Sequence, residues 1–180
     1  TYAVSKLAAD LWAQTMAFEH KLPVVVLRPF NVFGPRDTCP RFITEAIRQC
    51  FKAPVIQVGN IESSRDYTYV EDTARAIMLA LEVEEGLGEV INIGTERSLK
   101  MSEILKMIRT ITGEERKEVV QDQARLRPHD VPVLMSSFRK ASRVLGWKPE
   151  VDFHEGLQKT IGWYVENGKT WSYEERGWHW

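Results

Sequence analysis

The chain reads Val24-Val25-Val26-Leu27-Arg28-Pro29-Phe30-Asn31-Val32-Phe33-Gly34-Pro35 at the point that decides its fold class. Its first four residues, 24–27, are all apolar and mostly β-branched, the pattern of a strand that is covered on both faces. Two prolines and one glycine then fall within residues 28–35, which predicts a loop at the end of that strand and not a continuing strand. A strand covered on both faces is typical of parallel sheets flanked by helices.

Helical and strand patterns alternate on both sides of this stretch. Upstream, apolar residues recur at three- and four-residue steps from Val4 to Leu22, which predicts one long helix. Alternation of the two patterns predicts an α/β fold. Downstream, the patterns predict helices over residues 40–51, 70–83, 101–111, 138–145 and 153–165, strands over 55–58, 90–93 and 117–121, and an extended loop over 126–132.

Composition excludes several classes of protein. The 180 residues carry 24 Lys and Arg against 25 Asp and Glu, so the net charge of −1 gives no electrostatic case for binding nucleic acid or a membrane surface. No apolar run approaches the length of a membrane span. Two cysteines, Cys39 and Cys50, are too few for a disulfide scaffold, so a cytoplasmic location is expected. The four histidines are scattered and show no spacing suited to a metal, so no metal site is expected.

The start of the chain is helical in pattern from its first residues. Residue 1 is Thr, with no initiating Met and no signal-peptide pattern, and no capping sequence precedes the helix. We therefore expect the chain to be the C-terminal part of a longer protein.

Tyr2 and Lys6 stand four positions apart, so on a helix they share one face and reach a common ligand. A phenol is a weak base at neutral pH, and a nearby ammonium group favours its phenolate form. Such a pair suits a group that exchanges a proton with a sugar hydroxyl. The spacing alone leaves a solvated helix face as the alternative.

Five motifs follow one another in a fixed order along the chain. They are Tyr2 to Lys6 (Y-A-V-S-K), Arg28 to Pro35, Gly59 to Asp72 (G-N-I-E-S-S-R-D-Y-T-Y-V-E-D), Arg127 to Asp130 (R-P-H-D) and Ser142 to Pro149. With these motifs the chain resembles the extended short-chain dehydrogenase/reductase family, in particular its NAD-dependent nucleotide-sugar epimerases and dehydratases. Residues 65–69 and 72–73 look closest to the dehydratases.

The resemblance implies roles around the cofactor. Tyr2 would be the catalytic acid/base at the C4 hydroxyl of the sugar. Lys6 would bind the ribose hydroxyls beside the nicotinamide and favour the phenolate form of Tyr2. The backbone at Pro29 and Phe30 would lie near the nicotinamide. NAD is expected as the cofactor, in preference to NADP.

The resemblance also implies a nucleotide-sugar site. Asn31, Arg65 and Arg127 match positions that hold the nucleotide diphosphate, and Asp130 matches one that contacts the nucleoside ribose. The chemistry agrees, because guanidinium groups bind phosphate oxygens in bidentate fashion. For each arginine alone, a surface ion pair is the alternative interpretation. The expected partners are a nucleotide-diphosphate sugar and a second copy of the chain in a homodimer.

The resemblance divides the chain into two parts. Residues 1–35 would be the last part of the Rossmann-like dinucleotide-binding domain, including the Tyr–Lys helix. Residues 36–180 would form mainly the smaller substrate-binding α/β domain, with some segments returning to the Rossmann sheet. The family's glycine-rich dinucleotide fingerprint is absent, because the glycine-dense stretch 86–88 follows a predicted helix and precedes a predicted strand. The Ser or Thr that accompanies the catalytic Tyr is absent as well.

The primary hypothesis is therefore an NAD-dependent nucleotide-sugar epimerase or 4,6-dehydratase that oxidises the sugar at C4 to a 4-keto intermediate. A nucleotide-uronic-acid decarboxylase of the same family shares that first step. A hypothesis from another class is a nucleotide-sugar-binding or assembly module without turnover. On the primary hypothesis the full-length protein is an enzyme, and these 180 residues alone are expected to be inactive.

Overall fold

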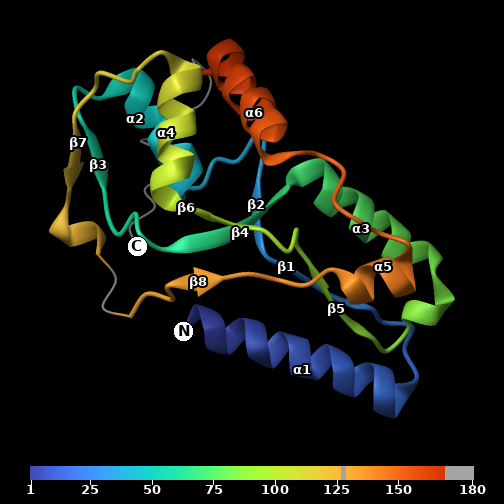
Figure 1. Ribbon diagram of the computed structural model, residues 1–180. Helices are drawn as coiled ribbons and strands as arrows, with labels where there is room; N and C mark the ends of the chain where they lie inside the picture. Colours follow the sequence, from blue (N-terminus) through green and yellow to red (C-terminus); the bar gives the residue numbers. More distant parts are fainter. Residues whose placement is uncertain (127–128, 169–180) are drawn as a thin grey trace.

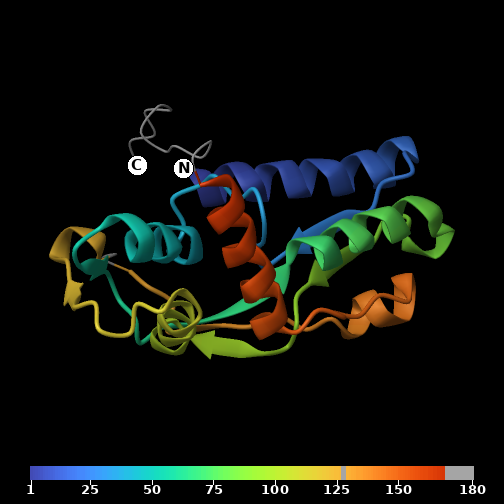
Figure 2. The ribbon, with the colours of Figure 1, turned by 90° about the horizontal axis from the view of Figure 1, so that it is seen from above.

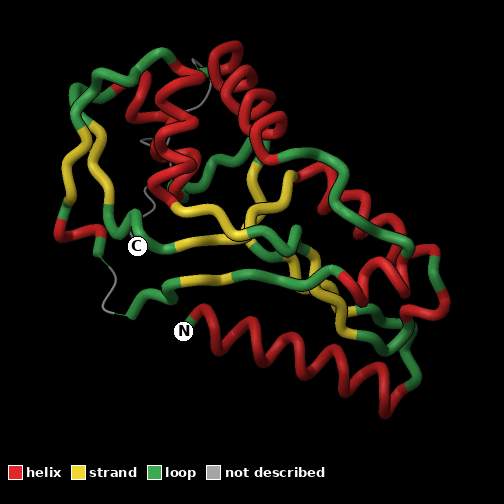
Figure 3. Tube along the Cα trace, viewed as in Figure 1, coloured by secondary structure: helices red, strands yellow, loops and turns green. Residues whose placement is uncertain are grey.

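The computed structural model describes residues 1–126 and 129–168, and helices alternate with short strands along them (Figures 1 and 3). In chain order the elements are α1 (Tyr2–His20), β1 (Val26–Pro29), β2 (Asn31–Phe33), α2 (Phe42–Lys52), β3 (Ile56–Val58), β4 (Ser64–Tyr69), α3 (Val70–Glu82), the 3₁₀ turn η1 (Glu84–Gly86), β5 (Val90–Ile93), β6 (Ser98–Lys100), α4 (Met101–Thr112), β7 (Val119–Gln121), the 3₁₀ turn η2 (Gln123–Arg125), β8 (Val133–Leu134), α5 (Arg139–Leu145) and α6 (Phe153–Asn167).

The strands form three small sheets in which parallel pairing predominates. β1 pairs with β5 in parallel, and β3 pairs with β7 in parallel. β4 lies between β2, which is parallel to it, and β6, which is antiparallel, and β8 adds a short parallel pairing to the start of β4. Parallel pairs connected through helices are the pattern of an α/β fold, as the sequence predicts.

Two hydrophobic clusters lie under these elements. The first cluster joins α2, β3, α4 and α6 and includes Ile47, Ile104 and Leu157. The second joins β5, α3 and α5 around Trp147, which is fully buried. Both views show the corresponding arrangement: α1, α3 and α5 gather with β1 and β5 at one end of the molecule, and α2, α4, β3 and β7 lie at the other (Figures 1 and 2).

The predicted loop over residues 28–35 is wrong. β1 continues through Pro29, and after a break at Phe30 the chain forms β2 in a different sheet. Pro29 has no backbone N–H to donate, so it stands at the last position of β1. The Phe30 N–H then donates to the carbonyl of Ile93, 2.9 Å away, which completes the pairing with β5 before the chain changes sheets.

The other predicted helices and strands are found with shifts of a few residues at their ends, whereas β4, β6 and β8 are not among the predicted strands. The first helix ends at His20 and not at Leu22, because Lys21 adopts a left-handed conformation with φ of 55°. Residues 24–27, predicted to be covered on both faces, are only half-buried. No residue of α1, all of which the structure describes, is buried.

A buried carboxylate joins three segments that are far apart in the sequence. Asp66 of β4 is fully buried and accepts hydrogen bonds from the backbone N–H and the hydroxyl of Thr95, at 2.9 and 2.6 Å. It also accepts from the backbone N–H and the hydroxyl of Ser136, at 3.1 and 2.6 Å. Gly94 has room for no side chain, since an added Cβ would lie 2.0 Å from the Ser136 hydroxyl. One side chain thus fixes β4, the β5–β6 turn and the β8–α5 link together.

We predict that Asp66→Asn lowers the free energy of unfolding by about 2–4 kcal/mol, because the amide NH₂ cannot accept and would face buried donors. Urea unfolding of the 180-residue chain measures this change. Glu118→Gln, at an exposed position, is the matched control and should change the value by less than about 0.5 kcal/mol. Equal stabilities of the two variants would contradict the role given to Asp66.

Candidate functional site

Tyr2 and Lys6 lie on one face of the first turns of α1. The Tyr2 side chain is 75% exposed, and the Lys6 Nζ lies 5.7 Å from the centre of the Tyr2 ring. An ammonium group over a phenol ring makes a cation–π contact. Both polar ends are therefore open to a ligand that approaches the start of the helix.

A salt bridge between Asp10 and Arg28 links α1 to β1. The Arg28 Nε donates to Asp10 Oδ2 at 2.6 Å, and an Arg28 terminal nitrogen donates to Oδ1 at 3.1 Å, so the pair is bidentate. The hydrogen bond from Arg28 lowers the pKa of the Asp10 carboxyl, and the same bond raises the pKa of Arg28. The contribution of this pair to stability is therefore present above the ordinary carboxyl pKa and is lost as the pH falls below it.

This pair also places Tyr2 and Lys6 beside the end of β1. α1 and β1 run in opposite directions, so residues before Asp10 lie on the same side of the bridge as residues after Arg28 (Figure 1). Lys6 stands four positions before Asp10, about 6 Å along the helix axis. Pro29 and Phe30 follow Arg28 directly, at the carboxyl end of the parallel pair of β1 and β5. In open α/β sheets this end of the strands is where ligands bind.

Asn31 opens β2 and is tied to β4. Its side-chain Nδ2 donates to the backbone carbonyl of Asp66, 3.0 Å away, and its backbone lies opposite Tyr67 in the parallel register. The amide group is half-buried. This hydrogen bond fixes the position of Asn31 immediately after Pro29 and Phe30.

The structure brings Arg65 and Asp130 into direct contact. A terminal nitrogen of Arg65 donates to Asp130 Oδ1 at 2.5 Å, and the side chains are only 14% and 17% exposed. The other terminal nitrogen of Arg65 donates to the carbonyls of Val131 and Ser64, at 2.7 and 2.8 Å. The family resemblance implies that these two side chains bind neighbouring parts of one nucleotide but does not indicate that they pair. Arg127, the other predicted phosphate ligand, lies outside the described residues.

The predicted residues therefore fall into two groups. Tyr2, Lys6, Pro29 and Phe30 gather where α1 and β1 meet. Arg65 and Asp130 form a second group at the start of β4, and Asn31 is bonded to β4 one residue beyond Arg65.

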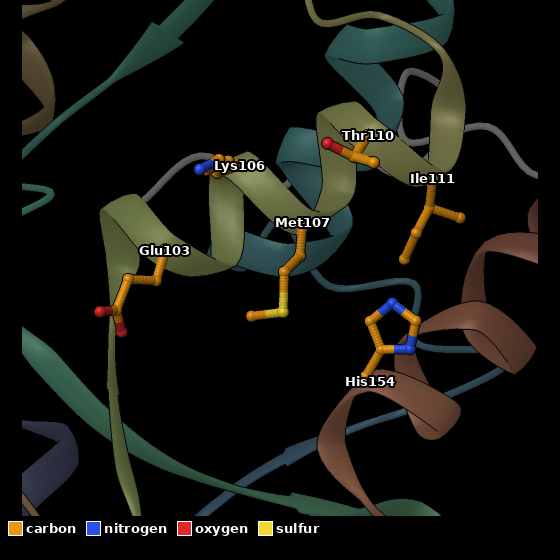
Figure 4. Close-up of a pocket in the computed structure, with 6 residues that line it drawn as sticks. All are labelled: Glu103, Lys106, Met107, Thr110, Ile111 and His154. Carbon is orange, nitrogen blue, oxygen red and sulfur yellow. The ribbon is translucent and has the colours of Figure 1, made fainter.

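A separate groove lies between α4 and α6. It has a volume of about 380 Å³ and an apolar floor of Met107 and Ile111, with His154 opposite (Figure 4). Lys106, Glu103 and Thr110 line its edge. None of the described site residues borders this groove, so it is not part of the predicted site.

Three residues near the site escape prediction from the sequence. Asp10 and Arg28 are 18 positions apart, and Asn60 and Asp130 are 70 apart, distances at which no pattern of periodicity indicates a contact. The one sequence signal for Asn60 is that it lies in the predicted Gly59–Asn60 turn.

Across residues 1–126 and 129–168, no group of three or more His, Cys, Asp or Glu side chains is placed to hold a metal ion. None of the described helices is long and apolar enough to span a membrane.

Comparison with known proteins shows the family to which these motifs belong. The family model described as GDP-mannose 4,6 dehydratase matches residues 1–160. The chain belongs to this family. The resemblance to the extended short-chain dehydrogenases/reductases that act on nucleotide sugars is confirmed, and so is the α/β fold class with its Rossmann-like relatives.

Relatives of this dehydratase family differ in their named activities. A dTDP-D-glucose 4,6-dehydratase of Mus musculus is 33% identical over 186 aligned positions, which cover 97% of this chain and 50% of the mouse protein. A UDP-glucose 4-epimerase of Thermotoga maritima, solved with UDP-glucose, matches with a TM-score of 0.84 at 33% identity, covering 92% of this chain and 53% of that one. A dTDP-glucose 4,6-dehydratase of Bacillus anthracis, solved with NAD, matches with a TM-score of 0.86 at 28% identity. This match covers 94% of the present chain and 53% of the Bacillus anthracis chain. The chain thus spans about half the length of these relatives.

We predict that Asp10→Asn loosens α1 without unfolding the rest of the chain, because it removes the charged partner of Arg28 from the described bridge. Amide hydrogen exchange in the first turns of α1 should rise about 3- to 10-fold, in keeping with a partly exposed bidentate pair. Exchange in α4 serves as the internal control and should not change. A uniform rise across both helices would contradict a local role for the pair.

Proposed function

We propose that this chain is the catalytic-helix and substrate-binding part of an NAD-dependent nucleotide-sugar 4-epimerase or 4,6-dehydratase. One observation carries the proposal: Tyr2 and Lys6 are exposed on one helix face, and the Asp10–Arg28 bridge holds that face beside Pro29 and Phe30 at the carboxyl end of β1. Membership of the nucleotide-sugar dehydratase family supports it.

The residues present fit the nicotinamide end of a dinucleotide. The Lys6 ammonium is a donor for ribose hydroxyls, and its only described contact is the face of the Tyr2 ring. Pro29 and Phe30 offer backbone and apolar surface at the strand ends, where a flat ring can lie. Bound there, NAD would supply the acceptor for the hydrogen at C4 of the sugar. We propose NAD in preference to NADP.

Tyr2 then performs the proton transfer. Its phenolate oxygen takes the proton of the C4 hydroxyl as that carbon is oxidised, which leaves a 4-keto sugar. The same phenol returns the proton when the ketone is reduced again, as epimerisation requires.

The second group of residues holds the nucleotide. We propose that Arg65, Arg127 and Asn31 bind the diphosphate and that Asp130 accepts from the ribose. Binding energy at the nucleotide, away from C4, orients the reacting carbon. The pairing of Arg65 with Asp130 supports a shared role, because it keeps a cation and an acceptor together in one partly buried place.

We further propose the division of the chain that the resemblance implies. Residues 1–35 would complete a cofactor-binding domain, and residues 36–180 would form mainly the substrate-binding domain. The pairing of β5 with β1 supports the return of later segments to the cofactor-binding sheet. Exposed apolar side chains along α1, including Leu7, Leu11 and Trp12, support association into a homodimer.

Two other functions are alternatives to the epimerase or dehydratase activity. A nucleotide-uronic-acid decarboxylase would use the same oxidation at C4 and the same residues. A binding or assembly module without turnover is favoured by one observation: the glycine-dense residues 86–88 form the end of η1 and a turn before β5, and not a strand-to-helix phosphate loop.

We predict that Tyr2→Phe lowers kcat of the full-length protein about 10²–10⁴-fold with little change in affinity for the nucleotide sugar, because only the proton-exchanging oxygen is lost. Lys6→Met should instead weaken NAD binding, because the ribose hydroxyls lose their donor. Steady-state kinetics and calorimetric titration with NAD measure the two effects. Unchanged NAD binding by Lys6→Met would contradict this division of roles.

We predict that Arg127→Ala weakens binding of a nucleoside diphosphate about 10- to 150-fold, since charged hydrogen bonds are worth about 1.5–3 kcal/mol. Binding of the free nucleoside should change little. Arg125→Ala is the matched control, because Arg125 pairs with Glu45 and Asp122. Calorimetric titration compares the two ligands. Equal losses for nucleoside and diphosphate would exclude a phosphate role for Arg127.

A further inference from the structure

The Asp130 carboxylate accepts hydrogen bonds at both oxygens, one from β4 and one from the connection that precedes β4. Arg65 of β4 donates to Oδ1 at 2.5 Å, and the Nδ2 of Asn60, in the connection between β3 and β4, donates to Oδ2 at 3.0 Å. Arg65 supplies charge, whereas Asn60 supplies a neutral donor with a defined direction. The rotation of the carboxylate is therefore fixed by two donors that lie five positions apart in the sequence.

Asn60 is itself fixed by a tight turn. Its Oδ1 accepts from the backbone N–H of Glu62 at 3.0 Å, which directs the Nδ2 end of the amide toward Asp130. The preceding Gly59 packs against η2, where an added Cβ would lie 2.5 Å from the carbonyl oxygen of Arg125. A side chain at position 59 would push this turn away, so the direction of the Asn60 amide depends on the local backbone.

The backbone that follows Asp130 is fixed as well. Ser64 N–H donates to the carbonyl of Pro132 at 2.7 Å, and β8 then pairs in parallel with residues 64 and 65. Arg65 also donates to the carbonyl of Val131. Because both its backbone and its carboxylate are fixed, the remaining lone pairs of Asp130 point in fixed directions.

We propose that Asn60 is a positioning residue that orients Asp130 to accept hydrogen bonds from the hydroxyls of a ribose, and thereby sets the preference of the site for nucleotides that carry them. An ionised carboxylate is an acceptor only, with about four lone-pair directions. Arg65 and Asn60 use one direction at each oxygen, and the others suit donors such as ribose hydroxyls. The inference rests on the proposed nucleotide site and adds the residue that determines how this site recognises the ribose.

The test compares UDP and GDP, each with its 2′,3′-dideoxy counterpart, by calorimetric titration of the full chain and of Asn60 variants. Asn60→Asp keeps the acceptor oxygen for the Glu62 N–H but removes the donor to Asp130. Asn60→Ala removes both. Glu62→Gln, at an exposed position two residues on, is the control.

The wild-type chain should favour the ribonucleotide about 10- to 150-fold, the worth of hydrogen bonds to a charged acceptor. Both Asn60 variants should lose about fivefold of that preference, only part of the whole because Asp130 keeps its hydrogen bond from Arg65, and Glu62→Gln should keep it. The ratio of the two affinities does not respond to a general loosening of the fold, which would weaken both ligands equally.

An unchanged ratio in Asn60→Asp and Asn60→Ala, with UDP or GDP still bound by the wild type, overturns the inference and leaves the proposed function standing. Equal losses of the ribo and dideoxy ligands overturn it as well. A wild-type chain that binds neither UDP nor GDP overturns the proposed nucleotide site itself.

Discussion

The buried carboxylate of Asp66 is the interaction on which the rest of the arrangement depends. Ionic groups are costly to bury unless hydrogen bonds satisfy them, and here the donors come from two segments far apart in the sequence, at Thr95 and Ser136. The strand that carries Asp66 also carries Arg65, and its backbone accepts from Asn31. The diphosphate-binding candidates are thus placed by a residue that need not touch a ligand at all.

A second interaction positions the residues of the proposed cofactor site. α1 buries none of its residues in the described structure, and hydrophobic burial therefore does little to place it on β1. The bidentate Asp10–Arg28 pair fixes the orientation of α1 relative to β1, because a guanidinium and a carboxylate pair in one geometry. Apolar contact does not impose such an orientation. Tyr2 and Lys6 derive their position relative to Pro29 and Phe30 from this pair.

Local patterns in the sequence predict the helices well and the site only in part. Apolar spacing identifies α2, α4 and α6 because each buries one face, and the Tyr2–Lys6 spacing follows directly from helix geometry. The change of sheet at Phe30 could not be predicted, since it depends on pairing with β5, more than 60 positions later. The Arg65–Asp130 pair and the donor from Asn60 are equally non-local. Family motifs predict Arg65 and Asp130 as site residues, but only the structure brings them into contact.

The central claim is that this fold positions a nucleotide sugar for oxidation at C4. Nuclear magnetic resonance of the products formed when the full-length protein meets UDP-, dTDP- and GDP-linked hexoses tests it most directly. The account predicts a change confined to the sugar and beginning at C4, either an inverted configuration or a 4-keto product, with the base and the diphosphate intact. Cleavage of the diphosphate, or turnover that leaves C4 untouched throughout, would contradict it.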